Sequence, residues 1–210
     1  MPTQPKGRVS RERILKAART VFARNPYASA SLRAIGKEGG FDPPLIHYYF
    51  STKADLFDAV LQELLAELYE KQLAWYEGLD MSRPGDALAV FLGRVFDYYV
   101  EHTEPFRILF INMAVLDGTQ DVPGLARIPG IFGAMAAMLR ERAPLLSGTT
   151  EEIAFFVHTF VNFLLLYLGS APCKGLVLKM DPLGPEYRRW VIEAMSYLFL
   201  PLIEKELSPQ

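Results

Sequence analysis

A helical spacing of apolar residues recurs along almost the whole chain, and this pattern limits the fold more than any other feature. In residues 10–24, apolar side chains follow one another at intervals of three and four, as on one face of a helix. Similar patterns predict further helices over 32–39, 53–78, 84–102, 105–117, 123–142, 150–170 and 185–206. No segment has the convincing alternation of a strand, and 171–185 reads as a loop. The sequence therefore predicts an all-α fold.

The composition limits the class of protein and its compartment. The chain has 210 residues, of which half are hydrophobic and 22% are charged, so one or two domains with a sizeable core are expected. Its one cysteine, Cys173, excludes an internal disulfide and a multi-cysteine zinc site within the chain. The N-terminus lacks the apolar region of a secretory signal, so we expect a cytoplasmic protein.

Charge is distributed unevenly along the chain. Residues 1–53 contain ten lysines and arginines against three acids, a balance of +7. The remainder contains 12 basic and 21 acidic residues, a balance of −9. A basic head on an acidic body indicates either an anionic partner for the head or a solvated surface that happens to be basic.

The segment from Gly40 to Phe57 predicts a very short helix followed by the start of a long one. Asp42 is suited to cap the short helix, and prolines suit its first turn, because the N–H groups there have no intrahelical partner. Three adjacent rings, at 47–49, cannot all face inward on a helix, so at least one is exposed. Thr52 with Asp55 forms the pattern of a capping box for the next helix.

Three short helices with a glycine turn before the third predict a helix-turn-helix head whose third helix enters the major groove of DNA. Pro44 and Leu45 suit thymine methyl groups, and Arg33 can reach a guanine edge or a phosphate. Lys53, at the first position of the next helix, suits a phosphate. The predicted DNA contacts are Ser31, Arg33, Pro44, Leu45, His47, Tyr48, Tyr49 and Lys53. The alternative is that the rings are core and the short helix is a connector.

The stretches "RERILKAARTVFARN" and "SLRAIGKEGGFDPPLIHYYFSTKADLF" resemble the DNA-binding head of the TetR-type transcriptional regulators. Glycine stands at 36 and 39, where that family usually has alanine, and Asp42 replaces its usual serine or threonine cap. The departures at His47 and Tyr49, where tyrosine and histidine are common, leave the operator sequence open. We expect a flexible basic tail over 1–9, the DNA-binding domain over 10–57, and a ligand-binding and dimerisation domain over 58–210.

The resemblance implies a body that dimerises through its last two long helices and encloses a small-molecule pocket. Ile153 to Ala171 carries no charge over nineteen residues, which fits either a membrane span or a helix buried on both sides. His158, Thr159 and Asn162 interrupt this run, which favours the helix at a dimer interface. Two-fold symmetry would present two recognition helices about 34 Å apart and imply a palindromic operator.

The pocket is predicted from aromatic and polar residues of the body. Most such side chains are ordinary core, and a backbone carbonyl or a water can satisfy each buried polar group. The predicted ligand contacts are Trp75, Tyr98, His102, Phe110, Met113, Phe132, His158 and Asn162. This lining suits an apolar or aromatic effector that carries one or two polar groups.

We therefore expect a homodimeric, ligand-responsive transcriptional regulator, most simply a repressor, that binds double-stranded DNA. No nucleotide-binding, nucleophile–base or metal-ligand motif is present, so we expect no enzyme activity, no cofactor and no metal site. The alternative is a helical protein without catalytic activity that binds lipid or a membrane surface through its basic head.

Overall fold

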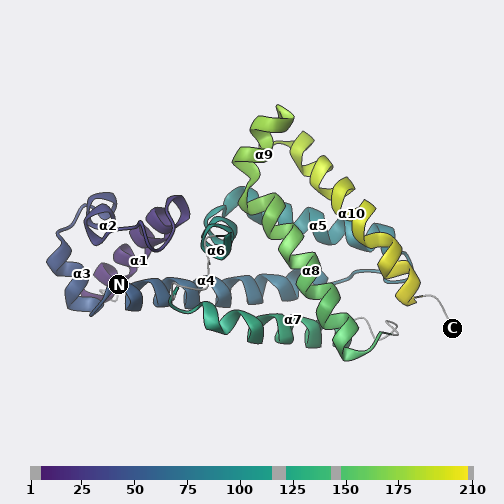
Figure 1. The fold of residues 1–210 in the computed structure, drawn as a ribbon, viewed down its shortest axis with the longest axis horizontal. Coiled ribbons are helices and arrows are strands. Elements are labelled where there is room, and N and C mark those ends of the chain that lie inside the picture. Colours follow the sequence, from purple (N-terminus) through teal and green to yellow (C-terminus); the bar gives the residue numbers. More distant parts are fainter. Residues whose placement is uncertain (1–5, 115–121, 143–147, 208–210) are drawn as a thin grey trace, which may run out of the picture. The chain divides into compact units, whose positions relative to one another are not determined.

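The structure is a computed structural model that describes residues 6–114, 122–142 and 148–207. Within these ranges the chain forms ten α-helices and one short 3-10 helix, with no strand (Figure 1), which confirms the predicted all-α class. The chain divides into two compact units. The first contains residues 1–68 and 104–126, and the second contains residues 69–103 and 127–210.

The first unit is the basic head with one additional helix. Its helices are α1 (Lys6–Arg24), α2 (Leu32–Gly39), α3 (Pro43–Tyr49), the first part of α4 (Lys53–Tyr76) and α6 (Glu104–Ala114). Helix α1 packs against α2 and α6, and α2 packs against α3. The largest fully buried side chains of this unit are Ile14, Phe22, Ile35, Ile46, Leu56, Phe57, Leu61 and Leu64. The apolar stripes read from the sequence therefore face one common core.

Local signals explain where the helices of this unit begin. The hydroxyl of Ser31 accepts the N–H of Ala34 at 3.1 Å, which caps α2. At the start of α4, the Asp55 N–H donates to Thr52 Oγ1 at 3.1 Å, and the Thr52 N–H donates to Asp55 Oδ2 at 2.9 Å. These reciprocal bonds confirm the capping box predicted from the sequence.

Helix α6 is attached to the head by polar contacts as well as by packing. Arg107 Nε donates to the carbonyl of Ala23 at 2.9 Å, where α1 ends and leaves carbonyls without intrahelical partners. Asn112, fully buried on α6, accepts the backbone N–H of Tyr27 at 2.8 Å. The connection between α1 and α2 is thereby tied to a helix that lies about 80 residues further along the chain.

The second unit contains the end of α4, α5 (Pro84–Glu101), α7 (Ile128–Arg142), α8 (Thr150–Gly169), α9 (Ala171–Leu178) and α10 (Pro185–Leu207). Helix α5 packs against α10, and α8 packs against α7 and α10. In Figure 1, α9 lies at the apex where α8 and α10 meet. The most deeply buried residues of the second unit include Leu92, Phe96, Tyr99, Leu168, Tyr187 and Met195.

Three sequence predictions about helices need correction or restriction. Residues 171–178 form α9 and not part of a loop; Pro172 occupies its first turn, which proline tolerates, and Lys179 ends it in a left-handed conformation with φ of 56°. The segment predicted as one helix over 123–142 divides into a 3-10 turn (Leu125–Arg127) and α7. Residues 115–117, predicted as helix, lie outside the described residues.

The predicted domain boundaries differ from the compact units. Helix α1 begins at Lys6, so residues 6–9 of the expected tail are helical, while residues 1–5 lie outside the described residues. The first unit extends the head to Leu68 and takes in α6. The division of function at residues 57 and 58 stays a prediction.

Candidate nucleic-acid interface

Helix α3 presents one face to solvent and buries the other. Pro44, His47 and Tyr48 are exposed at the spacings i, i+3 and i+4, which place them on the same side of the helix. Tyr48 is 79% exposed, and its ring meets that of Tyr49 edge to face, with centroids 4.9 Å apart. Ile46 points into the core. The prediction that at least one of the three adjacent rings is exposed is confirmed.

The first turn of α3 offers almost no hydrogen-bond donor. Pro43 and Pro44 have no N–H, and the Leu45 N–H donates to the carbonyl of Asp42 at 3.0 Å. Asp42 occupies the N-cap position, but its carboxylate makes no capping bond, because Pro44 has no N–H and the Leu45 N–H bonds to the Asp42 carbonyl. The helix begins at Pro43, directly after Asp42.

A glycine turn fixes α3 against α2. Gly40 ends α2 in the left-handed conformation with φ of 68°, and the Phe41 N–H donates to the carbonyl of Gly36 at 3.0 Å. A Cβ atom on Gly36 would lie 2.6 Å from the carbonyl oxygen of Phe41. Glycine at position 36 therefore allows the backbone of Phe41 to lie close to α2. Helix propensity alone would not explain a glycine at this position.

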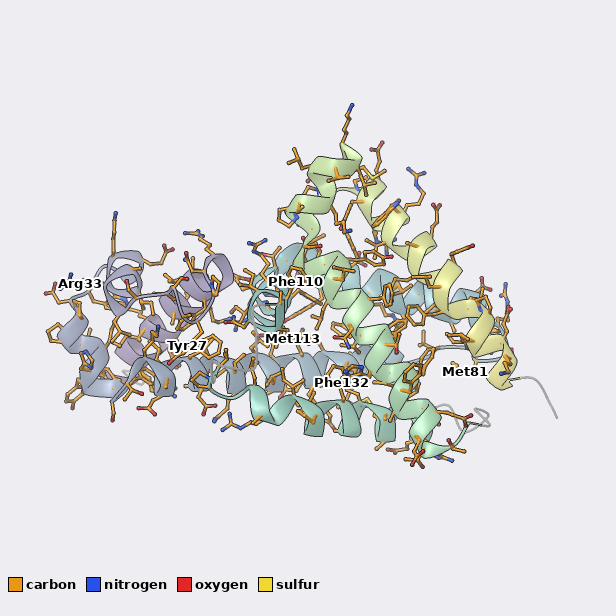
Figure 2. All side chains as sticks on the ribbon, in the orientation of Figure 1. Tyr27, Arg33, Met81, Phe110, Met113 and Phe132 are labelled. Atoms are coloured by element: carbon orange, nitrogen blue, oxygen red, sulfur yellow. The ribbon has the colours of Figure 1, made fainter. Side chains whose placement is uncertain are left out.

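Two cations of α2 stand beside the start of α3 without a resolved ion pair in the described part of the chain. Arg33 and Lys37, one turn apart on α2, line an open hollow together with Asp42 and Pro43 at the start of α3. Figure 2 shows Arg33 at the outer surface of the head. The sequence reasoning selected Arg33 but missed Lys37, although the i, i+4 spacing from Arg33 would have indicated it.

Other arginines of the head are engaged within the protein. Arg13 Nη2 donates to the carbonyl of Gly39 at 3.1 Å, which ties α1 to the end of α2. Arg19 donates through both terminal nitrogens to Glu67 Oε2 at 3.0 Å, and Arg24 pairs with Glu38 at 3.3 Å. The net charge of the head therefore overstates the number of cations that a ligand can use.

Lys53 also has an internal role. Its ammonium donates to the carbonyls of Tyr27, Ala28 and Ala30 at 2.8, 3.4 and 3.0 Å, and it lies 4.4 Å from the centroid of the Tyr27 ring. Partial burial lowers the pKa of Lys53, and burial followed by the nearby Asp55 charge raises the pKa of Tyr27. Three carbonyls use all three ammonium protons, so this geometry opposes the predicted phosphate contact.

The residues predicted to bind an effector fall into separate groups. In the second unit, the Tyr98 ring lies 5.6 Å from that of Trp75 and 4.7 Å from that of His102. Arg94 Nη1 donates to the carbonyls of Trp75 and Glu77 at 2.9 and 2.7 Å, which fixes the end of α4 beside α5. This first group is an aromatic cluster with one imidazole.

The second group joins α7 to α8. The rings of Phe132 and His158 lie 4.8 Å apart, and Asn162 Nδ2 donates to the carbonyl of His158 at 2.8 Å. Figure 2 shows Phe132 on α7. Phe110 and Met113 lie on α6 in the first unit.

Helix α8 meets the length and composition of a membrane span, the one such helix among the described residues. However, Ile153, Phe160 and Leu168 are buried against other helices of the second unit. The core helix of a folded domain passes the same test, so the match in length and hydropathy is weak evidence for a membrane. Among the residues that the structure describes, no group of three or more histidine, cysteine or acidic side chains is arranged to hold a metal ion.

The comparisons with known proteins agree with this arrangement. The family model described as "Bacterial regulatory proteins, tetR family" matches residues 14–60. The chain is 32% identical over 100 residues to the HTH-type transcriptional repressor NicS of Pseudomonas putida, covering 48% of this chain and 46% of that protein. It is 26% identical over 132 residues to the HTH-type transcriptional repressor SCO4008 of Streptomyces coelicolor, covering 63% of this chain and 64% of that protein. The matches thus span less than two thirds of either repressor.

The fold of the whole chain is similar to that of solved regulators. A TetR family transcriptional regulator from Agrobacterium tumefaciens superposes with a TM-score of 0.66 at 16% identity, over 97% of this chain and 100% of the other. NicS, SCO4008 and the Agrobacterium protein are named as transcriptional repressors or regulators, and none of the three is named as an enzyme. Residues 14–60 thus match the family model of the TetR regulators, and the whole chain is similar in fold to a solved regulator of that family.

Proposed function

We propose that the chain is a cytoplasmic, homodimeric transcriptional repressor that releases a palindromic operator when a small molecule binds. The observation that carries this proposal is the solvent-exposed face of α3, flanked by Arg33 and Lys37 of α2, in a head that matches the family model. A short exposed helix beside two surface cations suits the major groove and its two phosphate backbones.

Each exposed side chain of this surface has a role that its chemistry permits. Pro44 and Leu45 can contact thymine methyl groups, while the ring atoms and hydroxyls of His47, Tyr48 and Tyr49 can bond to phosphates or bases. Arg33 can make two parallel bonds to guanine or one to a phosphate. The Ser31 hydroxyl accepts a bond at the cap of α2, and its own proton stays available for a phosphate.

Dimerisation is supported by apolar side chains that α8 and α10 leave exposed. On α8, Phe155 is 74% exposed, and Leu166 lies eleven residues further on, which is just over three full turns and on the same face. On α10, Tyr197 is 84% exposed and stands near the exposed Leu198 and Leu202. Two such helices from each protomer can form a four-helix interface with two-fold symmetry. That symmetry would set two α3 helices about 34 Å apart on DNA.

The effector would bind in the second unit. The Trp75, Tyr98 and His102 cluster and the Phe132, His158 and Asn162 group each combine rings with one or two polar groups. Such surroundings suit an apolar or aromatic molecule with a few polar atoms. Phe110 and Met113 remain predicted contacts on α6.

Coupling between the effector and DNA would pass through elements that take part in both units. Helix α4 begins in the first unit, directly after α3, and ends in the second, beside Trp75. A coupling of about 1–3 kcal/mol is enough to change operator affinity by about 5–150-fold. The effector must then bind the free protein more tightly than the DNA-bound protein by the same factor, since linkage is reciprocal.

The test is fluorescence anisotropy with the purified full chain and the intergenic DNA beside its own gene, with random-sequence DNA as competitor. The proposal predicts binding that resists the competitor, with two protomers per site. Liposome flotation with anionic vesicles is the parallel measurement for the alternative of a lipid-binding protein. Flotation with the vesicles, together with DNA binding that random DNA removes equally well, would contradict the proposal.

A further inference from the structure

The exposed face of α3 lacks every side chain that reads a base through two parallel hydrogen bonds. Its members Pro44, His47 and Tyr48 offer only imidazole nitrogens and one hydroxyl, and the helix contains no arginine, lysine, asparagine, glutamine or acid. Those missing side chains are the ones that pair with guanine, adenine or cytosine edges in the major groove. Sequence discrimination by this helix must therefore come largely from apolar contact.

We propose that α3 recognises thymine methyl groups through Pro44, assisted by Leu45, and that each operator half-site carries a thymine beneath the start of α3. This inference rests on the proposed function and specifies the DNA that the same surface selects. Thymine alone presents a methyl group in the major groove, and apolar side chains are its usual partners.

The backbone at the start of α3 excludes the alternative of reading through N–H groups. Two successive prolines remove the first two donors, and the Leu45 N–H is already bonded to the Asp42 carbonyl. The same loss of donors prevents this end of the helix from anchoring a phosphate. The proline ring of residue 44 is thus what the start of the exposed face offers to a base pair.

Asp42 is the competing reader at this end of the helix. Its exposed carboxylate makes no capping bond and can accept a bond from cytosine N4 or adenine N6. However, Pro44 lies on the exposed face itself, in line with His47 and Tyr48, whereas Asp42 precedes the helix. Arg33 and Lys37, beside the start of α3, supply charge complementarity to the DNA backbone.

The first experiment is selection of bound duplexes from a random-sequence library by the purified full chain, followed by replacement of each thymine pair in the selected operator with deoxyuridine. Deoxyuridine keeps the hydrogen-bonding edge of thymine and lacks only the methyl group. Loss of one buried methyl should weaken binding about fourfold per half-site at the contacted position. All other thymines should be nearly neutral to replacement.

The second experiment links that position to Pro44. The Pro44→Ala variant lacks the ring. The ratio of its affinities for the thymine and deoxyuridine operators should therefore fall towards one, while general DNA binding persists. Pro43→Ala is the matched control, because it restores an N–H in the same turn but changes the neighbouring, partly buried ring. Circular dichroism melting of both variants reports whether the head remains folded.

The outcomes separate this inference from the proposed function. If the selection yields no preferred sequence, the proposed function itself fails. If a preferred operator emerges but no thymine responds to deoxyuridine, or the penalty is unchanged in a folded Pro44→Ala protein, methyl readout is wrong. A selected cytosine or adenine whose preference disappears in Asp42→Asn would overturn it in favour of the carboxylate.

Discussion

The side-chain oxygen of Asn112 accepts a hydrogen bond from the backbone N–H of Tyr27 at 2.8 Å, across 85 residues of sequence. Asn112 is fully buried, and its amide nitrogen donates to the carbonyl of Ile108 at 2.8 Å. Tyr27 in turn contributes its carbonyl and its ring to the surroundings of the Lys53 ammonium. One amide therefore links α6 to the segment that holds the start of α4.

Asn112→Ala should destabilise the first unit, because the Tyr27 N–H loses its partner in a buried site. The expected loss is about 1–3 kcal/mol of unfolding free energy, measured by urea denaturation. Asn162→Ala is the matched control, since Asn162 Nδ2 also donates to the carbonyl four residues earlier, but the bonds resolved for its side chain stay within one turn of α8. Equal effects in the two variants would mean that the long-range bond contributes nothing.

Gly36→Ala should destabilise the protein even though alanine is the better helix former. The new Cβ would lie 2.6 Å from the Phe41 carbonyl oxygen, and relieving this clash requires a backbone shift that costs roughly 1–3 kcal/mol. Gly133→Ala on α7 is the control, because a Cβ there meets nothing within 4 Å. That change should stabilise by about 0.5–1 kcal/mol. Thermal melting that shows a gain in both variants would refute the account of the turn.

Tyr197→Glu should convert a dimer into a monomer, because it places a charge in the proposed apolar interface. Size-exclusion chromatography with light scattering measures the change, and operator affinity should fall roughly 100-fold or more as the second half-site is lost. Leu176→Glu on α9 alters a similarly exposed apolar residue outside α8 and α10 and should leave the dimer intact. Dissociation by Leu176→Glu alone would place the interface elsewhere.

The capping box of α8 gives a prediction about pH. The backbone N–H of Thr149 and then its hydroxyl hold the pKa of Glu152 below its usual range. Because the folded pKa is depressed, the stabilisation is present above the unfolded pKa and is lost as the pH falls through the lower folded pKa. The stability difference between the wild type and Glu152→Gln should therefore be present at neutral pH and shrink in acid. A difference that stays constant with pH would argue against this role of the charge.

Much of the fold follows from local signals in the sequence. The caps at Ser31 and Thr52 are read correctly because each depends on residues three positions apart. The apolar stripe of residues 10–24 and the glycine turn before α3 are similarly local. Two kinds of feature are not predicted from the sequence. The first is a contact between residues far apart in the chain, and the second is a helix that contains residues which usually end helices.

Lys53, Gly36 and α9 illustrate these limits. The carbonyls that surround Lys53 come from a segment more than twenty residues away, so its position at a helix start indicated an anion instead. Glycine has a low helix propensity, so the sequence alone gives no reason for Gly36 within α2. The reason is the carbonyl oxygen of Phe41, which lies 2.6 Å from where a Cβ atom would be. The proline and glycine of α9 read as loop signals, whereas Gly175 is required because a Cβ there would lie 2.7 Å from the Met180 carbonyl oxygen.

The salt dependence of DNA affinity for matched Lys37→Met and Lys53→Met variants shows which surface of the head contacts DNA. Lys37 lines the open hollow beside α3, so its loss should reduce the slope of log affinity against log salt by about one for each protomer, with unfolding free energy unchanged. Lys53 is held by three carbonyls, so its loss should lower stability and leave the slope as it was. A slope that is unchanged in Lys37→Met but smaller in Lys53→Met would show that DNA contacts Lys53 and not the surface beside Lys37.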